Sequence, residues 1–552
     1  MLIDPVVGER FFGRNDVLAL LEKRVDALKS GYRQNIAITG HRLTGKSSVL
    51  NHFLSTFKSH EILPIYIEVL EEPFRQFATK FIGIFLYNYL KYNDKEARDD
   101  LDYLIQECEK EIPVTVSHIK NILKLIQSNN NESAYSELLN LSSVLKEESN
   151  RRCIVMLDEF HNLSCLGIKD PFKGFGKKIM TQKDTMYIVA SSEVSSIQKI
   201  LSEKLALLFG NFEKITLGGF DCETSRAFLQ KKLSGVKLNE ELLDFIIAFA
   251  DGHPFYLDVL SSKIQELLGK TGMKALTMST VVKALQELLF DSRGTINQFF
   301  TNLLQDLLEA KTEKYIDTLT ALAHGLYKQR ELSEWSGCNK KEISKHLNTF
   351  IEKNLIYSSG NVYRFYDKAL RFWLKDVYHK RRTTLVDNIS DKSKVFRGDV
   401  EAMIQRFLDE SRLDVIERIK TLFESFNNEI VNINSKRRRL MHFDRTEITD
   451  NGERRYIVGY LKEKVYLVHI AQRKIGENDI LEFIKCGMQY KPHLQRHIIL
   501  PLQDMEINAK IIAKELRMWI FDFDTVNELL DMFGKQMIVR INRLPQAAEE
   551  AL

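Results

Sequence analysis

Residues 35–48, Asn-Ile-Ala-Ile-Thr-Gly-His-Arg-Leu-Thr-Gly-Lys-Ser-Ser, decide the fold of the N-terminal part of this 552-residue chain. The apolar residues at 36–38 predict a buried strand, and residues 48–54 have the apolar spacing of a helix. Between them lie two glycines five positions apart, followed by a lysine and two hydroxyl side chains. A strand, a glycine-bearing loop and a helix in this order predict a loop whose backbone N–H groups hold phosphate oxygens.

Each residue type in such a loop has a mechanical role. The glycines allow a tight backbone turn, Lys46 would reach the β- and γ-phosphates of a nucleotide, and the Ser47 hydroxyl would ligate Mg²⁺. A chance glycine turn is the alternative, and the flanking strand and helix disfavour it. We therefore expect ATP and Mg²⁺ as cofactors. The residues of the loop expected to contact the nucleotide are Gly40, His41, Arg42, Leu43, Thr44, Gly45, Lys46, Ser47 and Ser48.

A second motif supplies carboxylates. Five consecutive apolar residues at 153–157 predict a strand buried on both faces, and this strand ends in Asp158 and Glu159. Ligands of open α/β sheets bind at the carboxyl ends of the strands, so we expect Asp158 to hold Mg²⁺ together with Ser47. Glu159 would polarise the attacking water. A plain surface strand end is the alternative, and the phosphate loop upstream favours the catalytic interpretation.

A further predicted strand at 186–190 is followed by Ser191 and Ser192. A hydroxyl at this point can hydrogen-bond the attacking water or the γ-phosphate, although a strand-ending turn fits the residues nearly as well. The expected catalytic residues are Glu159, Lys46 and Ser192, and the expected metal ligands are Ser47 and Asp158.

Composition limits the class of protein. Apolar residues make up 44% and charged residues 28%, as in ordinary folded proteins, and the length predicts about three or four domains. The formal net charge of +4 is small, so a nucleic-acid surface would be a local patch. The six cysteines form no CxxC pair, which predicts a reducing compartment and no zinc site. We expect a cytoplasmic protein without membrane association, because no apolar stretch approaches the ~20 residues of a membrane span.

Several short motifs follow one another in a characteristic order: Phe12-Gly13-Arg14, the loop 40–47, Leu157-Asp158-Glu159-Phe160, Ala190-Ser191-Ser192 and Asp251-Gly252-His253-Pro254. From residue 11 to about 378 the chain resembles the archaeal-type ATPases of the signal-transduction (STAND) branch of P-loop NTPases, relatives of the initiator and helicase-loader ATPases. The resemblance implies that Phe12, Gly13 and Arg14 lie near the adenine. It also implies that the turn ending in Pro254 starts a helix in a small lid domain that senses the nucleotide.

Taken alone, these last motifs have simpler interpretations, namely a helix lead-in at 12–14 and a helix stop at 252–254. The resemblance also leaves one part missing, because Arg226 is the only arginine between Ser192 and Gly252. Arg226 lies in a helical stretch, and we expect it to be solvated or to pack within the lid. A slow nucleotide switch therefore fits better than fast hydrolysis.

Residues 314–365 predict a winged helix-turn-helix, with helices at 315–324, 332–337 and 340–353 and a β-hairpin at 355–365. The helix at 340–353 would be the recognition helix, with Lys340, Lys341, Lys345 and His346 facing double-stranded DNA. In the alternative, the module packs structurally on the lid and the lysines form a solvated face.

The pattern changes again in the tail. A helix at 401–425 is followed by strands at 456–460 and 464–471, a helix at 478–490, a strand at 497–500, a helix at 507–516 and a strand at 519–521. This order resembles the restriction-endonuclease-like domain often fused to such ATPases.

A nuclease of that kind needs an acid on its first hairpin and an acid-x-lysine on the next strand to hold Mg²⁺. Tyr456 stands where the first acid is expected, and the second strand offers His469-Ile-Ala471 or Gln472-Arg-Lys474. Asp444, Glu447 and Asp450 lie upstream as weak substitutes. We expect a degenerate domain used for binding or assembly rather than cleavage. The basic run Lys436–Arg439 would track phosphates or form a solvated cluster.

The expected fold class is a multidomain α/β protein: a P-loop NTPase parallel sheet with a helical lid, a winged helix-turn-helix and a C-terminal α/β restriction-endonuclease-like domain. The expected boundaries are 1–218 for the ATPase core with a helical insertion at about 73–150, 219–310 for the lid, 311–385 for the winged helix, 386–435 for a helical linker and 436–542 for the tail domain. The expected function is a slowly hydrolysing, ATP-binding switch that acts on DNA, through the winged helix and basic tail, or on a protein partner, which includes a second copy of the chain. The alternatives are an ATP-gated DNA nuclease of the defence type and a winged-helix DNA-binding regulator that ATP stabilises.

Overall fold

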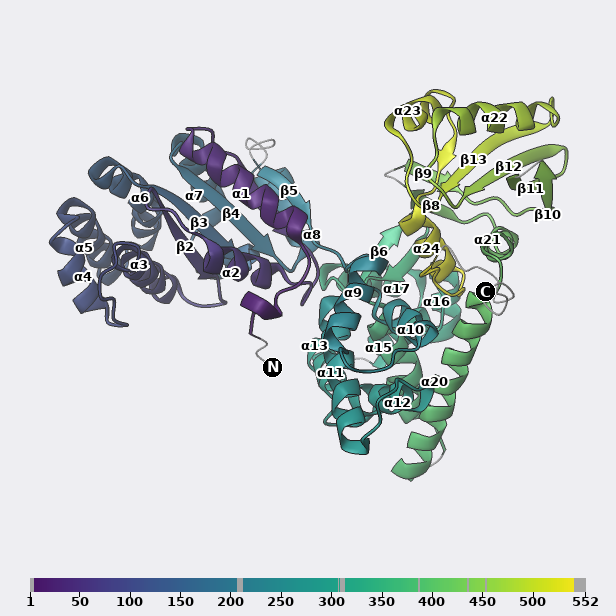
Figure 1. Cartoon of the computed structure of the whole chain (residues 1–552). Coiled ribbons are helices and arrows are strands. Elements are labelled where there is room, and N and C mark those ends of the chain that lie inside the picture. The colour runs from purple at the N-terminus through teal and green to yellow at the C-terminus, as the bar shows by residue number, and fades with distance from the viewer. Residues whose placement is uncertain are drawn as a thin grey trace. The chain divides into compact units, whose positions relative to one another are not determined.

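Figure 1 shows the computed structural model of the chain, which describes residues 4–205, 212–305, 307, 313–385, 388–433, 436–451 and 454–540. The described residues form two compact units. The first runs up to Phe220 and includes His253–Phe255, and the second contains Asp221–Gly252 and the residues from Tyr256 onward. The expected domain boundaries at 310–311, 386, 435 and 542 lie outside the described residues. No helix in the described ranges combines the length and the apolar character needed to cross a membrane.

The first unit is built on a five-stranded sheet in which every pair of neighbouring strands is parallel. Its strands are β1 (Asn35–Thr39), β2 (Ile62–Glu68), β3 (Arg152–Asp158), β4 (Thr185–Ser191) and β5 (Phe212–Thr216). The strands predicted at 36–38, 153–157 and 186–190 are confirmed. The strand order is β2-β3-β4-β1-β5, so β4 lies between β1 and β3 and the carboxyl ends of all three meet at one edge.

Helices cover both faces of this sheet (Figure 1), and each face has its own apolar cluster. Ile36 and Ile38 belong to one cluster and Ala37 to the other, which explains why the strands are apolar throughout. One cluster contains α1 (Asn15–Lys29) and α2 (Lys46–Thr56); the other contains α3 (Phe74–Lys91), α4 (Leu101–Glu109), α5 (Pro113–Gln127), α6 (Asn131–Ser149) and α7 (Pro171–Thr181). Shorter helices lie at Gly8–Arg10, Phe160–Cys165, Val194–Lys199 (α8) and Ile200–Lys204.

The stretch predicted to be helical between the second strand and the Asp158 strand forms α3 to α6. Of its aromatic residues, Tyr89 is buried, and Tyr87 and Tyr92 pack against the same apolar cluster.

The second unit begins with helices and a hairpin. The first helices are α9 (Cys222–Lys232), α10 (Glu240–Ala250), α11 (Pro254–Thr271), α12 (Met278–Leu285), Gln286–Phe290 and α13 (Thr295–Leu303). They are followed by α15 (Glu313–Ala323), α16 (Gln329–Ser336), α17 (Lys340–Glu352) and the antiparallel pair β6 (Ile356–Ser359) and β7 (Val362–Phe365). The chain continues through α18 (Lys368–Phe372), Trp373–His379, α19 (Lys380–Thr383), α20 (Ile389–Ser411) and α21 (Val415–Glu424). The three helices and the hairpin predicted between 314 and 365 are therefore present.

The C-terminal part of this unit contains a mixed five-stranded sheet with the strands in sequence order. The strands are β10 (Arg445–Asn451), β11 (Arg454–Leu461), β12 (Lys464–Ala471), β13 (Leu494–Pro501) and β14 (Trp519–Ile520). The first three are antiparallel, and β13 and β14 run parallel to β12. One apolar cluster contains α22 (Glu477–Met488) and α23 (Ile507–Glu515), and the other contains α21 and α24 (Phe523–Met532). A separate ribbon pairs β8 (Ile430–Ile433) with β9 (Lys436–Arg439).

Two expectations for this region are wrong. The single helix expected at 401–425 is divided into α20 and α21, because Asp414 accepts a hydrogen bond from the backbone N–H of Ile416 at 2.9 Å and begins a new helix. In addition, no strand was expected before 456, whereas β10 pairs with β11 along its whole length. Its sequence, Arg-Thr-Glu-Ile-Thr-Asp-Asn, has only one apolar residue and lacks the alternation that marks a half-buried strand.

An ion-paired carboxylate connects the hairpin to the C-terminal part. Asp531 of α24 accepts hydrogen bonds from Arg364 of β7 at 2.9 Å and from Arg371 of α18 at 2.6 Å. Burial alone would raise the pKa of Asp531, but Arg371, Lys368 and Arg364 lower it well below its usual range. Nearby, the backbone N–H of Asn361 donates to the carbonyl of Ile430 at 2.9 Å.

We predict that Asp531→Ala lowers the free energy of unfolding by about 3 kcal/mol, because it leaves two guanidinium groups poorly compensated in a mostly buried position. The exposed pair Arg330–Glu334 provides the control, and Glu334→Ala should cost less than about 1 kcal/mol. Since the folded-state pKa of Asp531 lies below its ordinary value of 3.8, the contribution is complete above about pH 4 and is lost as the pH falls. Denaturant unfolding of the variants at pH 7 and pH 3 measures both effects; equal losses for the two variants would contradict the prediction.

Candidate functional site

The loop between β1 and α2 can close only because residue 40 is glycine. A Cβ atom on Gly40 would lie 2.4 Å from the backbone oxygen of Leu217, just beyond β5, and 2.9 Å from the Thr44 hydroxyl. Gly45 has φ +95°, a left-handed conformation that favours glycine. The loop is thus constrained at Gly40 by the close approach of the Leu217 backbone, and at Gly45 by a left-handed conformation that favours glycine.

Lys46 lies at the start of α2 and is only 4% exposed. Its ammonium donates to the carbonyl oxygens of Gly40 at 2.9 Å and His41 at 2.8 Å. Burial lowers the pKa of Lys46, while the carboxylates of Glu159 and Asp158 raise it. The lysine therefore reaches back over its own loop, where phosphate oxygens held by the loop would meet its positive charge.

Asp158 stands at the end of β3 and is 1% exposed. It accepts hydrogen bonds from the Tyr66 hydroxyl at 2.9 Å, from the backbone N–H of Glu159 at 2.9 Å and from the Ser47 side chain. Burial raises the pKa of Asp158, and the Ser47 hydrogen bond opposes this change. Two oxygen donors expected to share Mg²⁺ are thus already in contact.

Glu159 is held by the end of the neighbouring strand. Its carboxylate accepts from the backbone N–H of Ser192 at 3.0 Å and from the Ser192 hydroxyl at 2.8 Å. The strand order makes this contact possible, because β4 lies directly beside β3. Ser192 was expected to face water or phosphate, whereas here it binds the carboxylate of Glu159.

Two residues of this site were missed in the sequence. His161 lies 3.4 Å from the Glu159 carboxylate and is hydrogen-bonded to the Ser191 hydroxyl at 2.9 Å, both through Nδ1. Tyr66 of β2 holds Asp158, as described above. His161 lies two residues after Glu159, so its place in the site could have been predicted from the sequence. Tyr66 is brought to Asp158 by the pairing of β2 with β3, which no local motif reveals.

The lead-in segment lies beside the same loop. The Arg14 guanidinium donates to the carbonyls of Thr44 at 3.3 Å and of Gly218, and it lies 4.8 Å above the ring of Phe220. The ring of Phe12 is 6.3 Å from that of Phe220. Gly13 and Arg14 both have positive φ, so this segment makes a tight turn. Through the hydrogen bond of Arg14 to Thr44, the segment Phe12-Gly13-Arg14 therefore lies beside the loop at 40–48.

The residue before Pro254 also reaches the loop. His253, which belongs to the first unit, donates through Nε2 to the carbonyl of Arg42 at 3.2 Å. Burial lowers the pKa of His253 to about 4, and burial together with Lys46 lowers that of His41 to about 4. Both imidazoles are neutral at pH 7, so they add hydrogen-bonding groups rather than charge to the loop.

Arg226 of α9 pairs with Asp244 and, at 2.7 Å, with Glu240, both on α10. It therefore packs among the helices of the second unit, as expected.

The expected recognition helix is α17. Lys340, Lys341 and Lys345 are exposed on it. His346 was expected on the same surface, and this expectation is wrong. His346 is 5% exposed, hydrogen-bonded to the Thr318 hydroxyl at 2.9 Å and packed on the ring of Tyr315, because its position on the helix faces α15.

The tail residues considered for metal binding are dispersed. Tyr456 is buried and lies opposite His469 in the β11–β12 register. Glu447 accepts from the Tyr460 hydroxyl at 2.5 Å, Asp450 lies 3.5 Å from Arg455, and Asp444 accepts from the backbone N–H of Lys462 at 2.8 Å. Gln472 and Lys474 are exposed beyond the end of β12.

Residues 11–260 match the family described as an ATPase domain predominantly from Archaea. This part of the chain is therefore similar to an ATPase domain. The match covers the parallel sheet, the loop at 40–48 and the carboxylates at 158 and 159. Among curated proteins, none matches the chain.

Similar solved structures include the Walker-type ATPase PABY2304 of Pyrococcus abyssi, at 17% identity and a TM-score of 0.47, over 68% of this chain and 99% of that chain. The ORC2 protein of Aeropyrum pernix, in ADPNP–ADP complexes, is 11% identical with a TM-score of 0.42, over 72% and 97% of the two chains. The RuvB Holliday junction branch migration motor of Thermotoga maritima is 12% identical with a TM-score of 0.34, over 68% and 98%.

We predict that Gly40→Ala weakens binding of Mg-ATP by at least about tenfold, because the new Cβ would displace either the loop or the backbone at Leu217. Gly83→Ala is the matched control, since Gly83 lies within α3 and a Cβ there meets nothing within 4 Å. Calorimetric titration of both variants measures the effect. Equal affinities for the two variants would show that the close approach at Gly40 does not shape the site.

Proposed function

We propose that this protein is a switch ATPase of the STAND type, which binds Mg-ATP at the loop 40–48, hydrolyses it slowly and conveys the state of the nucleotide to DNA or to a protein partner. The observation that carries the proposal is the pair of hydrogen bonds from Ser192 to Glu159, beside the contact of Ser47 with Asp158. These contacts bring the proposed base, the proposed metal-binding pair and the phosphate-binding loop together at one edge of the sheet.

The residues present fit a magnesium ion. Ser47 and Asp158 offer a hydroxyl and a carboxylate in contact with each other, and hard oxygen donors are what Mg²⁺ prefers. When bound, the ion would neutralise phosphate charge. Lys46 and the backbone N–H groups of residues 40–48 would hold the phosphates. The lead-in residues 12–14 and Pro254 would border the remainder of the nucleotide.

Glu159 is proposed as the base that takes a proton from the attacking water. Ser192 would fix the orientation of this carboxylate through two donors, so its catalytic role would be positional. Slow turnover is supported by Arg226, because its guanidinium forms ion pairs with Asp244 and Glu240 and is therefore not positioned to stabilise the transferred phosphate. A resting state with a bound nucleotide suits a switch better than a motor.

We predict that Lys46→Ala abolishes binding of Mg-ATP, because the fixed cation at the β/γ-phosphates is lost. Glu159→Gln should keep the binding affinity and reduce turnover by about 100-fold or more, since it removes the base and leaves Ser47 and Asp158 intact. Calorimetry and a phosphate-release assay separate the two steps. Wild-type turnover in Glu159→Gln would assign the base to another residue, and wild-type affinity in Lys46→Ala would exclude this loop as the nucleotide site.

The second unit is proposed to contain the effector parts. We propose that α15 to β7 form a winged helix and that the C-terminal mixed sheet is a degenerate restriction-endonuclease-like domain. The proposed divisions are 1–218 with an insertion at about 73–150, 219–310, 311–385, 386–435 and 436–542. The hairpin β6–β7 is engaged by β8, through the Asn361–Ile430 hydrogen bond, so DNA contact would come from α17 alone.

Charge reversal of Lys340, Lys341 and Lys345 to Glu is predicted to weaken binding to duplex DNA. The slope of log affinity against log salt should fall in magnitude by up to about 3, because each phosphate contact that is lost no longer releases counterions from the DNA. Reversal of the exposed lysines Lys485, Lys510 and Lys514 on α22 and α23 is the matched control. Gel shifts across a salt series give the slopes. Identical slopes for the two triple variants would make α17 a packing element rather than a DNA-binding one.

The alternative of an ATP-gated nuclease has less support in the tail. Tyr456 occupies the position of the first acid, and burial raises its pKa, so the hydroxyl stays neutral at pH 7 and is a poor metal ligand. Plasmid incubated with the full-length protein, ATP and Mg²⁺ should stay supercoiled. Linear product that disappears in Lys474→Ala would favour the nuclease instead.

A further inference from the structure

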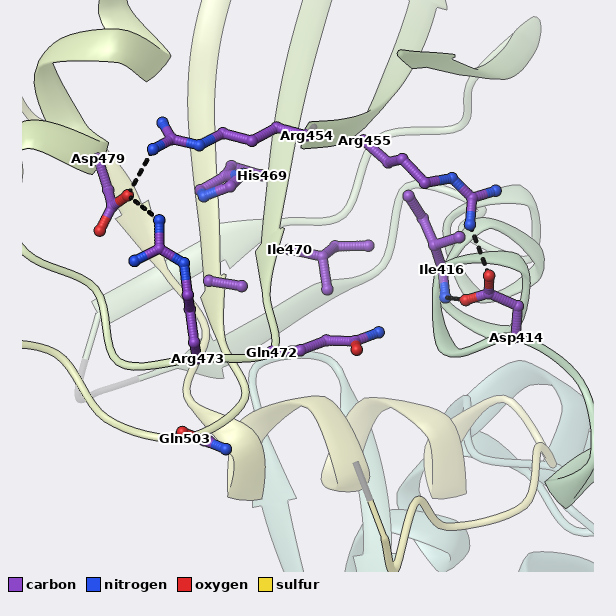
Figure 2. Close-up of a pocket in the computed structure, with 11 residues that line it drawn as sticks. Asp414, Ile416, Arg454, Arg455, His469, Ile470, Gln472, Arg473, Asp479 and Gln503 are labelled. Atoms are coloured by element: carbon purple, nitrogen blue, oxygen red, sulfur yellow. Dashed lines mark hydrogen bonds and ion pairs between the residues drawn. The ribbon is translucent and has the colours of Figure 1, made fainter. Parts of the chain in front are cut away.

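A pocket of about 650 Å³ lies in the C-terminal domain of the second unit. It is formed at the carboxyl end of β12 by the start of β11, the residues after β12, the start of α21 and the first turn of α22 (Figure 2). Its volume is that of a site for a small organic ligand. The ATPase site lies in the other unit, so this pocket is a separate feature of the chain.

Charged side chains stand on two sides of the pocket. Figure 2 shows Arg454, Arg473 and Asp479 on one side, and Arg455 with Asp414 on the other. Arg454 and Arg473 donate to the same oxygen of Asp479, at 2.8 and 2.9 Å. One carboxylate thus orients two guanidinium groups toward each other and neutralises only one of them. Glu482 also contacts Arg454, but its side chain is 54% exposed and solvent screens it.

The three arginines and two aspartates that line the pocket leave a net formal charge of +1. Guanidinium groups are planar donors that match the oxygens of phosphate. A phosphodiester carries a single negative charge and would balance this lining.

His469 adds an independent observation. It lines the pocket, is 5% exposed, and its Nδ1 has no hydrogen-bond partner among the described residues. Burial and the neighbouring Arg454 lower the pKa of His469 to about 4, so the imidazole is neutral at pH 7. Buried polar atoms are almost always hydrogen-bonded in native proteins, so an unsatisfied one in the wall of a pocket points to a ligand.

The middle of the pocket is suited to a base. Ile470 and Gln472 lie between the two charged sides in Figure 2, and Ile416 approaches from α21. The isoleucine side chains offer apolar surface to a planar ring, and a glutamine amide can pair with the hydrogen-bonding edge of a base.

We propose that this pocket binds one nucleotide unit without a metal ion, with the phosphodiester held by Arg454 and Arg473 and the base received by Ile470 and Gln472. A free cyclic nucleotide and a nucleotide within a DNA strand share this chemistry. The proposal goes beyond the switch ATPase, because it requires neither ATP hydrolysis nor DNA binding by α17.

The test uses the full-length protein with the ATPase site saturated with Mg-ADP, so that the probes do not compete for the loop 40–48. One set of titrations uses the four 3′,5′-cyclic mononucleotides, and the other uses single-stranded DNA oligonucleotides. Arg473→Gln is the test variant, because the Arg473 side chain is 72% exposed and its loss leaves the core intact. Lys510→Gln makes the same charge change on the exposed surface of α23, outside the pocket.

We expect Arg473→Gln to weaken binding by at least about tenfold relative to Lys510→Gln, as for the loss of a charge-assisted hydrogen bond. Binding of a cyclic nucleotide with this pattern identifies a free ligand, and binding of the oligonucleotide alone identifies a strand; both support the pocket. If wild-type protein binds none of the probes, or if the two variants bind equally well, the proposal is overturned. Melting temperatures of both variants show whether the fold is retained.

Discussion

The backbone of the phosphate loop passes so close to the end of β5 that only a residue without a side chain fits at position 40. The Cβ that any other residue would carry lies 2.4 Å from the Leu217 oxygen, and the backbone N–H of Leu217 donates to Thr39 at 2.7 Å. This contact fixes where the loop begins, and α2 fixes where it ends. These two fixed ends determine the positions of Lys46 and Ser47. The lysine folds back over Gly40, and the serine reaches Asp158 on another strand. The proposed nucleotide site would therefore be a consequence of backbone packing as much as of the residues that would bind the ligand.

The order of the strands provides the second constraint. Because β4 lies between β1 and β3, its end meets both the loop and the carboxylates, and Ser192 donates twice to Glu159. A displacement of the end of β4 would change the orientation of Glu159, the proposed base. In the proposed switch, this contact would couple hydrolysis to movement of β4 through residues of the first unit. In the second unit, the ion-paired carboxylate of Asp531 joins α24 to Arg364 of the hairpin and Arg371 of α18, and the hydrogen bond between Asn361 and Ile430 joins the hairpin turn to β8.

Much of the first unit could be predicted from the sequence, since its signals are local. Residues 36–48 and 153–159 each contain a complete pattern, and the structure has the strands, loop and helix that they indicate. What could not be predicted depends on register. Tyr66 reaches Asp158 only because β2 pairs with β3, and the serine at 192 was expected to face the ligand, although it holds Glu159. In the tail the local sequence signals are weaker, because β10 is polar and the turn at Asp414 contains no glycine or proline. The role of Asp479 could not be predicted either, because Arg454 and Arg473, which bind it, come from the ends of two different strands.

We propose that Mg-ATP binds between the loop 40–48 and the carboxyl ends of β3 and β4. Amide hydrogen exchange of the full-length protein, with and without Mg-ATP, tests it most directly, because it reports on each backbone N–H that the phosphates would engage. We expect slower exchange at residues 42–48 when Mg-ATP is bound, together with a change at Glu159 and Ser192. Unchanged exchange throughout 40–48, with protection elsewhere in the chain, would contradict it.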